Sequence, residues 1–364
     1  MKKNYFLIVL TALTGAVTVQ AQEPYAVYND DDKALTFYYD TQKADRNGMD
    51  VVPFTDGSER AWDNKKEKIK SVVFDASFAD CTTLTSTAWW FCLCDRMTSI
   101  TGLENIHTEN VTDMSNMFQG CAKLTSLDLS SFKTDKVENM SSLFWGCYKL
   151  ESLNLSGWNT KNVTSMFGMF SQCKELESLD LSGFDTGQVS SVMFMFQGCE
   201  NLTSLDLSSF NTASMTDLGF MFSGCTNLIT LDLSSFNTAN VESMWMTFSN
   251  CSHLTTIYVG DGWTVEKVIA SLEDASTYNL FEGCEKLVGG QGTTYSSNNS
   301  DLLYARIDGG QSAPGYLSKK ISTGIKHQMA DERRDESVYT LGGQRLPAPR
   351  KGVNIIGGRK VVVR

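Results

Sequence analysis

The sequence is poor in the residues and charges on which several functions depend. It contains only three histidines, His107, His253 and His327, and none of them lies beside a cysteine in a motif of its own. Net positive charge is also lacking: the formal net charge is −11, which argues against nucleic acid or an anionic membrane surface as a partner. Beyond the N-terminus no stretch is long and apolar enough to cross a bilayer, so no transmembrane span is predicted.

The N-terminal residues have the pattern of an export signal. Lys2 and Lys3 precede the apolar run YFLIVLTALTGAV, and the small-residue pattern Val19-Gln20-Ala21 follows it. A short membrane anchor is the alternative, but the run is brief and interrupted by threonine. We therefore predict a signal peptide over residues 1–21, cleaved after Ala21, and an exported protein that is secreted or held at the cell surface.

The cysteines are spaced as positions of a repeat. Six of the ten lie 26 residues apart: Cys121, Cys147, Cys173, Cys199, Cys225 and Cys251. Cysteines in an exported chain normally suggest disulfides, but this regularity predicts small buried apolar side chains instead. Cys92 and Cys94 form a lone C-x-C, a weak metal signal without a second pair. The one disulfide worth testing joins Cys81 to Cys92 or Cys94.

The first half of each repeat has the pattern of a strand. In the copy CAKLTSLDLSSFKT (121–134) the leucines follow the L-x-x-L-x-L spacing of a leucine-rich repeat. Alternation directs Leu127 and Leu129 into the core and Asp128 to the opposite face. The equivalent positions predict one column on the sheet face: Asp128, Asn154, Asp180, Asp206, Asp232 and Tyr258.

The second half of each repeat has a helical rhythm. Val111, Met114, Met117, Phe118 and Cys121 fall at offsets 0, 3, 6, 7 and 10, on one side of a helix. Stacking such units buries their apolar faces as continuous ladders. The predicted fold is therefore an α/β leucine-rich-repeat solenoid, with a parallel sheet on one wall, short helices on the other, and β-rich caps.

The remaining sequence divides around this array. YAVYNDDDKALTFYYD alternates like a β-hairpin around a polar turn. The C-terminal residues contain six Lys/Arg and no acid, and they predict two or three strands with Gly357-Gly358 as a tight turn. The expected segments are a signal peptide (1–21), an N-terminal β cap (22–80), the solenoid (81–290), a C-terminal cap (291–320), a linker (321–336) and a small β tail (337–364).

The run NVTDMSNMFQGCAKLTSLDLSSFKT resembles the 26-residue repeat of the BspA-like family of bacterial leucine-rich repeat surface proteins. The resemblance covers about residues 70–290. It implies an exported protein of anaerobic bacteria, some relatives of which are adhesins for host matrix or plasma glycoproteins. The tail is similar to C-terminal sorting segments of one surface-secretion pathway, although it is shorter. The shared motif is the scaffold, so the resemblance assigns no binding residues.

The sheet-face column supports two interpretations. Asp180, Asp206 and Asp232 should stand in line, about 4.8 Å apart. Carboxylates this close repel one another unless cations, hydrogen bonds or raised pKa values relieve the repulsion. A Ca²⁺ or glycan site is one interpretation, and a ladder solvated by water and serine is the other. Calcium sites usually need irregular loops, which favours the ladder. A pair of glycosidase carboxylates needs two unlike environments and a pocket, and a uniform ladder provides neither. We therefore predict no enzyme and no catalytic residue. We also predict no cofactor other than this candidate Ca²⁺.

A second surface changes character along the array. The fifth residue before each repeat cysteine is in turn Asn116, Ser142, Gly168, Phe194, Phe220 and Met246. On a helical wheel this position lies opposite the buried face, and Phe167 lies on the flank. A contiguous exposed apolar patch usually marks an interface; the alternative is irregular helices that tuck the rings between turns. The partner-binding candidates are Trp145, Phe194, Phe220, Trp245 and Met246.

These patterns together favour binding over catalysis. The leading hypothesis is a non-catalytic adhesion platform for host matrix or plasma glycoproteins, or for other surface proteins of host or microbe. The alternative is a surface carbohydrate-capture protein. That function needs aromatic platforms on the sheet face, where only Tyr258 qualifies.

Overall fold

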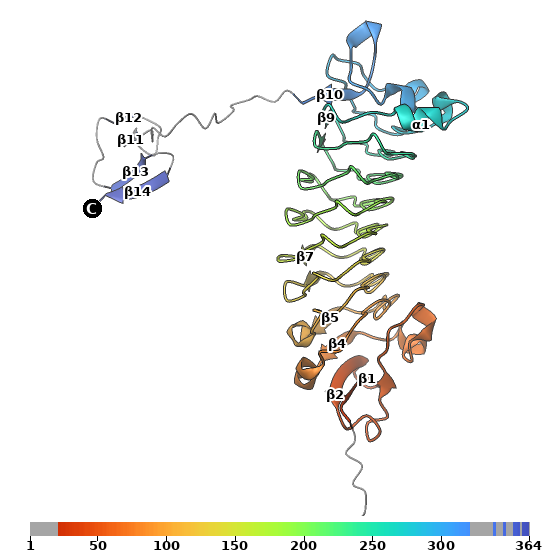
Figure 1. Cartoon of the computed structure of the whole chain (residues 1–364), viewed down its shortest axis with the longest axis vertical. Helices are drawn as coiled ribbons and strands as arrows, with labels where there is room; N and C mark the ends of the chain where they lie inside the picture. Colours follow the sequence, from red (N-terminus) through yellow and green to blue (C-terminus); the bar gives the residue numbers. More distant parts are fainter. Residues whose placement is uncertain (1–20, 321–337, 340–344, 347–351, 357–358, 364) are drawn as a thin grey trace, which may run out of the picture. The chain divides into compact units, whose positions relative to one another are not determined.

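The computed structural model describes residues 21–320, 338–339, 345–346, 352–356 and 359–363. The chain divides into two compact units, with the boundary after Lys320. Apart from Ala21, the predicted signal peptide lies outside the described residues, and so does the predicted linker. In the first unit the chain forms coils that stack in sequence order from the N-terminal strands onward (Figure 1).

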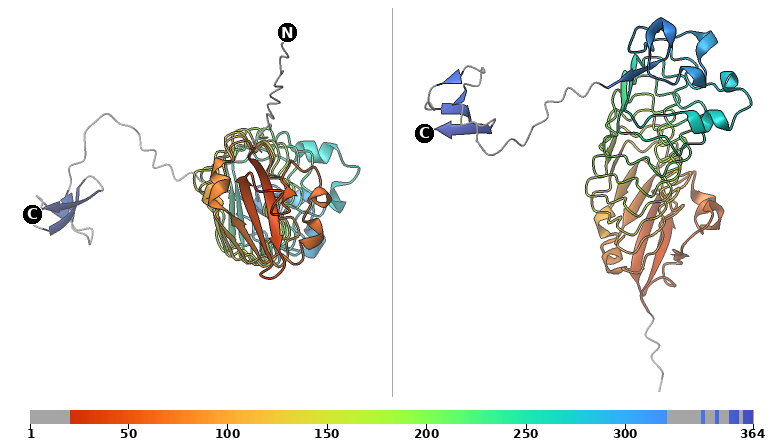
Figure 2. Two further views of the ribbon diagram at one scale, coloured as in Figure 1. Left: turned by 90° about the horizontal axis from the view of Figure 1, so that it is seen from below. Right: turned by 45° about the horizontal axis from the view of Figure 1, so that its top comes forward.

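A five-stranded sheet forms the N-terminal end of this stack, in the order β3-β1-β2-β4-β5. Its strands are β1 (Glu23–Asn29), β2 (Ala34–Asp40), β3 (Met49–Asp50), β4 (Ser71–Phe74) and β5 (Ser99–Thr101). The hairpin β1–β2 is antiparallel, whereas β4 and β5 continue from β2 in parallel. Leu35, Phe37, Val72 and Phe74 are buried. Figure 2 views the stack from this end, with β1 and β2 in front of the coils.

The strand wall of the coils is parallel, as predicted, but its sheets are short. The strands are β6 (Ser126–Asp128), β7 (Ser152–Asn154), β8 (Thr230–Leu233), β9 (Thr256–Val259) and β10 (Leu317–Lys319). β6 pairs with β7 and β8 with β9, each in a register of one full repeat. The outward Asp128 accepts a hydrogen bond from the N–H of Ser130, which turns the chain directly after the strand and keeps it short.

The predicted helices of the opposite wall are absent from residues 21–320, where this wall consists of turns. The one α-helix described is α1 (Glu266–Ala270), in the insertion of the last repeat. The 3₁₀ helices lie outside the turn wall, at Gly57–Glu59, Asp63–Lys65, Ala76–Asp80, Leu103–Asn105, Ala275–Thr277, Ser297–Asn299, Leu302–Tyr304 and Gly310–Ser312. The prediction of helices on this wall was therefore wrong.

Hydrogen bonding between coils explains why no helix forms. Asn116 N donates to Ser141 O and Phe118 N to Leu143 O, both in the next coil. Within a coil the bonds are those of tight turns, such as Cys121 N to Phe118 O. An α-helix would keep these donors for its own carbonyls four residues back. The wall instead gives alternate N–H groups to its neighbour, and its apolar residues still face inward.

Left-handed residues make this arrangement possible. We number wall positions back from the repeat cysteine, so that Asn116 is at position −5 and Gly120 at position −1. Both have positive φ, 57° and 72°. The same two positions are left-handed in every repeat up to Asn250. A left-handed residue interrupts an α-helix at once, and each repeat places two of them on this wall, four residues apart.

Two ladders of buried side chains fill the space between the walls. Phe118, Phe144 and Phe170 stack with ring centroids 5.8 and 5.7 Å apart, and the column continues to Phe281. Each repeat cysteine also donates a hydrogen bond, for example from Cys147 Sγ to Phe118 O at 3.2 Å. Burial raises the pKa of Cys147 to about 12, so the thiol stays protonated and able to donate. All ten cysteines, including Cys81, Cys92 and Cys94, are free and buried.

A buried threonine joins each coil to the next. Thr160 Oγ1 donates to Asp185 O at 2.8 Å and accepts from Asp185 N at 2.8 Å. Thr134 forms the same two bonds with Asn159. In the other coils the hydroxyl of the equivalent threonine also donates to a backbone carbonyl of the following coil; these residues are Thr108, Thr186, Thr212 and Thr238. These side chains satisfy one carbonyl per coil and, in most coils, one N–H.

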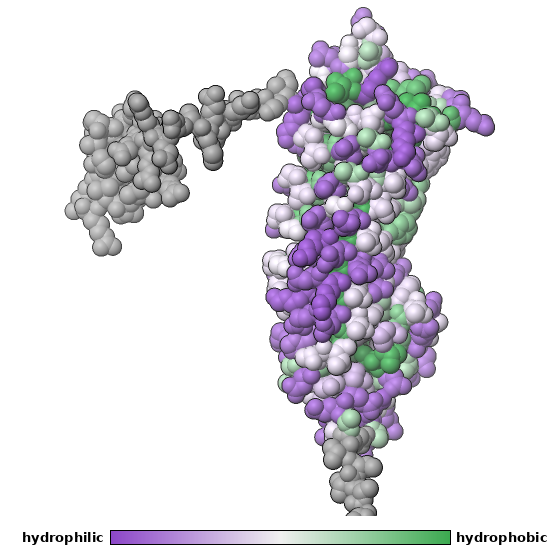
Figure 3. Space-filling view, viewed as in Figure 1, coloured by the Kyte–Doolittle hydropathy of each residue, from purple (hydrophilic) through white to green (hydrophobic). Residues whose placement is uncertain are grey.

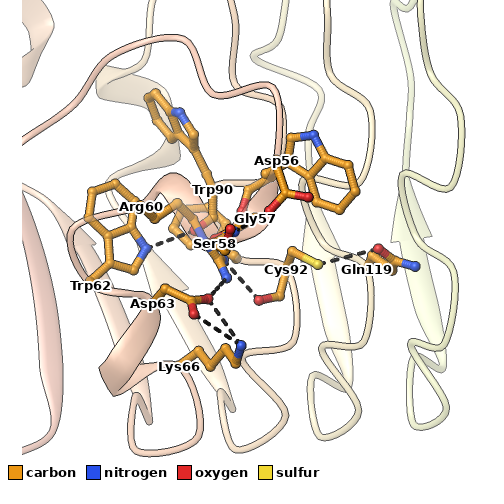
Figure 4. A network of polar contacts seen from close by, with 12 residues as sticks. Asp56, Gly57, Ser58, Arg60, Trp62, Asp63, Lys66, Trp90, Cys92 and Gln119 are labelled. Atoms are coloured by element: carbon orange, nitrogen blue, oxygen red, sulfur yellow. Dashed lines mark hydrogen bonds and ion pairs between the residues drawn. The ribbon is translucent and has the colours of Figure 1, made fainter.

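The N-terminal cap replaces the coil that the first repeat lacks. In later coils the carbonyls at positions −4 and −2 accept N–H groups from the coil before. In the first coil these carbonyls belong to Trp90 and Cys92. The buried Arg60 donates from Nη1 to Cys92 O at 2.8 Å, and Trp62 donates from Nε1 to Trp90 O at 3.0 Å (Figure 4). Asp63 accepts from Arg60 Nη2 at 2.6 Å and holds the guanidinium in place.

A buried carboxylate organises the C-terminal cap. Asp308 is 4 % exposed, and it accepts hydrogen bonds from Gln291 N, Thr293 N, Thr293 Oγ1 and Gly310 N. Burial on its own would raise the pKa of Asp308, but the bonds from Thr293, Gly310 and Gln291 lower it to about 2. The cap therefore depends on this side chain remaining charged.

The second unit, described by itself, is a four-stranded antiparallel sheet in the order β12-β11-β13-β14. Its strands are β11 (Val338–Tyr339), β12 (Arg345–Leu346), β13 (Gly352–Ile356) and β14 (Arg359–Val363). The sequence predicted two or three strands. The predicted turn at Gly357-Gly358 lies outside the described residues, but Ile356 pairs with Arg359 on either side of it.

The threonine ladder predicts a specific cost for losing one hydroxyl. Thr160→Val keeps the shape of the side chain but leaves Asp185 N and Asp185 O without this partner. We expect the free energy of unfolding to fall by about 1–3 kcal/mol, measured by chemical denaturation. Thr160→Ser keeps the hydroxyl and should cost less than Thr160→Val. Equal losses would contradict the role of the hydrogen bonds.

Asp308 predicts a contribution to stability at low pH. Its pKa falls from 3.8 to about 2 on folding, so its contribution is fully present above pH 3.8 and is lost as the pH falls towards 2. The contribution is about 2 kcal/mol. Asp308→Asn should therefore lose less stability than the wild type between pH 4 and pH 2, in denaturation measured at each pH. Parallel curves for the two proteins would contradict the assignment.

Candidate functional site

Four members of the predicted sheet-face column, Asp128, Asn154, Asp232 and Tyr258, lie in strands β6 to β9, whereas Asp180 and Asp206 lie in segments with no strand. Asp128 lies opposite Asn154 in the β6–β7 pair, and Asp232 lies opposite Tyr258 in the β8–β9 pair. Each carboxylate is bonded locally: the N–H of the serine two residues on donates to Asp128, Asp180, Asp206 and Asp232. The serine hydrogen bonds suggested by the sequence are therefore present.

These local bonds keep the column charged. Hydrogen bonds from Ser182 lower the pKa of Asp180, and those from Ser208 lower the pKa of Asp206. Burial on its own would raise the pKa of Asp232, but bonds from Lys320 and Ser234 outweigh it and lower that pKa. The carboxylates therefore remain ionised at neutral pH without a bound cation.

The last carboxylate of the column is paired with a cation from the chain itself. Lys320, directly after β10, donates to Asp232 and forms an ion pair with it. Within the described residues no group of three or more His, Cys, Asp or Glu side chains is arranged to hold a metal ion. The Ca²⁺ hypothesis for Asp180, Asp206 and Asp232 stays a prediction.

The surface in view in Figure 3 carries a hydrophilic column along the middle coils, with apolar colour in smaller patches nearer the ends. Charged pairs contribute to the polarity of the coils. Lys149 pairs with Glu175 at 2.8 Å, and Lys174 pairs with Glu200 at 2.6 Å, each across one repeat. Exposed pairs of this kind add little stability, but they keep the surface of these coils hydrated.

The turn wall carries the second predicted surface. Trp145, Phe167, Phe194 and Phe220, which we call the aromatic stripe, are neither fully buried nor fully exposed. Phe194 and Phe220 stack with centroids 4.8 Å apart, and Phe167 meets Phe194 edge to face at 5.5 Å. Trp145 lies 6.0 Å from Phe167 and 5.9 Å from Phe194. The structure thus joins rings from four successive coils in one cluster.

The other two candidates lie in the next coil. Trp245 is 37 % exposed, and its ring meets Tyr278 of the insertion edge to face at 5.0 Å. Met246 is half-buried, and its N–H donates to Asn279 O. Sequence patterns did not reveal Tyr278 as a neighbour, because the insertion that carries it has no counterpart in the other repeats.

The backbone beneath the aromatic stripe is unusual. Phe194 and Phe220 occupy position −5 and have φ of 61° and 56°. Other copies place Trp89, Asn116, Ser142, Gly168 or Met246 there, and of these types glycine and asparagine tolerate the left-handed conformation best. A bulky residue in this conformation costs of order 1 kcal/mol or more. The rings therefore occupy positions that the fold alone would give to glycine or asparagine.

The sequence did not reveal the roles of three sets of residues. The threonine ladder was visible as the threonine that ends each copy of SSFKT or SSFNT. Arg60 and Trp62 had no periodic signal, because they lie outside the repeats. The charge run DNKKEKIK (63–70) was also visible, but the sequence did not reveal that this segment folds back onto the first coil.

The fold and these surfaces define a leucine-rich-repeat type protein built from stacked coils. The family described as "Mycoplasma protein of unknown function, DUF285" matches residues 85–204 and 175–286. The two matches together cover more than half of the chain, and the chain belongs to this family. The match supports the resemblance of the repeats to BspA-like leucine-rich repeats. It does not extend to the tail.

Three solved structures are similar to the chain at low identity. A leucine-rich repeat protein from Bacteroides ovatus is 16% identical, over 73% of this chain and 80% of its own, with a TM-score of 0.30. A leucine rich cell surface protein from Faecalibacterium prausnitzii is 17% identical, over 71% and 93%, at 0.22. A leucine-rich repeat protein from Eubacterium ventriosum is 16% identical, over 78% and 100%, at 0.21. These TM-scores are too low to support an argument about fold or function.

No curated protein matches the chain. Among the residues that the structure describes, no helix has the length and apolar character needed to cross a membrane.

The left-handed backbone predicts that the stripe is not part of the stabilising core. Phe194→Asn removes a half-buried ring but relieves about 1 kcal/mol of backbone strain. We expect the free energy of unfolding to change by no more than about 1 kcal/mol. Phe196→Ala, in the buried ladder two residues on, should cost about 3–5 kcal/mol. Chemical denaturation of both variants checks this, and comparable losses would contradict it.

Proposed function

We propose that the protein is an exported, surface-associated solenoid whose function is to bind other proteins without catalysing a reaction. The observation that carries this proposal is that two rings of the aromatic stripe, Phe194 and Phe220, occupy left-handed positions. Strained residues persist where something other than stability favours them. Here the strain places apolar rings on an outer wall, and contiguous apolar patches on such surfaces commonly mark interfaces.

The scaffold suits a binding surface because it fixes the rings before a partner arrives. Phe194 N donates to Gly219 O and Phe220 N donates to Trp245 O, so each ring is attached to backbone that is bonded to the next coil. A preorganised surface loses little conformational freedom on association. Aromatic residues, Phe and Trp among them, are also enriched at the cores of protein interfaces.

The packing of the rings favours a protein partner over a carbohydrate. Sugars stack on open aromatic faces, but Phe194 and Phe220 stack on each other at an interplanar angle of 23°. Trp145 likewise stacks on Phe167 at 28°. A ring face that stacks on another ring is closed to a sugar, whereas apolar side chains of a protein can also contact ring edges. We propose host matrix or plasma glycoproteins, or microbial surface proteins, as partners, contacted through their polypeptide.

The double variant Phe194→Asn/Phe220→Asn tests this function. Asn is the residue found at the same position in Asn116, so the fold should tolerate it. We expect saturable binding of the full chain to an immobilised panel of matrix and plasma glycoproteins, measured by biolayer interferometry. The double variant should weaken it about thirtyfold or more, because the loss of even one hot-spot side chain costs about 2 kcal/mol or more.

Ile229→Asn is the matched control, since Ile229 is an exposed apolar residue outside the stripe, at 53 % exposure. It should leave affinity unchanged. The same measurement with calcium and with chelator tests the sheet-face column, and calcium dependence would move the proposed site there. Equal losses in the double variant and the control would contradict a role for the stripe, as would an absence of binding to every protein in the panel.

A further inference from the structure

A second surface lies at the N-terminal end of the stack, away from the repeats that carry the stripe. The β4 side of the cap and the first coil enclose an open cleft of about 530 Å³. Its lining includes Lys33, Lys66, Lys68, Lys70 and Arg96. Five cations around one cleft contrast with the rest of a chain whose formal net charge is −11.

Backbone hydrogen bonds bring these cations together from distant parts of the sequence. Lys70 N donates to Lys33 O, and Thr98 N, two residues after Arg96, donates to Lys70 O. The side chains of Lys33, Lys70 and Arg96 therefore line the cleft just before the adjacent parallel strands β2, β4 and β5 begin. The cluster follows from strand register and was not evident from spacing.

Not all of these cations are neutralised. Lys33 pairs with Asp30, and Lys66 pairs with Asp63 at 3.1 Å. Lys68, Lys70 and Arg96 are exposed, and within residues 21–320 their side chains have no ion-pair or hydrogen-bond partner. Three adjacent unpaired cations repel one another and favour an anion between them.

One wall of the cleft is rigid. Asp63 lies between Arg60 and Lys66 (Figure 4), and Arg60 is bonded to the carbonyls of the first coil. The buried guanidinium thus fixes the position of Lys66 relative to the stack. Recognition at the cleft needs little reorganisation of this wall.

The lining also contains acceptors, and they narrow the class of ligand. Asp63, Glu67 and Asp95 contribute carboxylates, and Asn64 contributes an amide. Among the lining residues there is no aromatic or aliphatic side chain to take an apolar group. A ligand that carries both anionic groups and hydroxyls satisfies the two kinds of group at once: cations bind its carboxylates or sulfates, and carboxylates accept from its hydroxyls.

We propose that this cleft binds an acidic glycan, a sugar chain bearing carboxylate or sulfate groups. This site is separate from the aromatic stripe and extends the proposed function with a second ligand class. An acidic peptide carries its carboxylates at the ends of side chains, away from its backbone N–H donors, whereas an acidic sugar carries anions and hydroxyl donors on one ring. The cleft has room for about one or two sugar units, so the contact is with a short segment of a longer chain.

The test uses the full chain and three probes: a heparin-derived hexasaccharide for sulfate, an oligogalacturonate for carboxylate, and polyglutamate for an acidic peptide. The variant is Lys68→Gln/Lys70→Gln/Arg96→Gln, which removes only the unpaired cations. Lys123→Gln/Lys133→Gln/Lys161→Gln is the matched control, since these exposed lysines lie on the coils and the net charge changes equally. The basic tail is common to both variants, so any binding by the tail cancels in the comparison.

We expect at least one of the two oligosaccharides to bind, with affinity about tenfold lower in the cleft variant and unchanged in the control. The preferred oligosaccharide identifies sulfate or carboxylate as the recognised group. Binding that is absent, or weakened equally in both variants, would overturn the proposal. Polyglutamate bound as tightly as the better oligosaccharide, with the same loss in the cleft variant, would overturn the assignment to a sugar.

Discussion

The structure depends on one constraint: every coil donates a row of backbone N–H groups to the coil that follows. On the turn wall this row runs from position −7 to position −1, and it is compatible only with a backbone that becomes left-handed at positions −5 and −1. Because no coil precedes the first one, its carbonyls at positions −4 and −2 receive no N–H group from a neighbouring coil. Arg60 and Trp62 satisfy them, so the N-terminal cap is a hydrogen-bond partner as well as a cover.

The constraint also separates the residues that stabilise the protein from those free to bind. Phe118, Cys147 and Thr160 are fixed by contacts with neighbouring coils, and their equivalents vary little along the array. Position −5 has no such inward contact, and its side chain changes from Asn116 to Phe220. Glycine or asparagine would suit its backbone best. Rings at this position therefore add an apolar surface without altering the stack, and the proposed function rests on that surface.

Periodicity predicted the stacking and the inward residues, because those depend only on which side chains recur. It did not predict the turn wall. A helix and a series of turns can both direct the same spacing of residues into the core, here Val111, Met114, Met117 and Phe118. Glycine at Gly120 and Gly146 was visible, but a left-handed Phe194 was not, because its type disfavours that conformation. The column from Asp128 to Tyr258 and the candidates Trp145, Phe194 and Phe220 followed from the repeat. Arg60, Tyr278 and the cleft cations did not, because their positions depend on non-repeating segments folding back onto the stack.

Deleting one whole repeat tests this account most directly. Removal of residues 174–199 takes out 26 residues, one period, and joins Cys173 to Glu200 in the same phase. Each remaining coil keeps its neighbour, so the shortened protein should fold and unfold in one cooperative transition. Removal of residues 174–198, one residue fewer, shifts every later N–H out of register and should abolish that transition. Equal stability of the two deletions, by chemical denaturation, would contradict the claim that coil-to-coil hydrogen bonding in a fixed period holds the structure together.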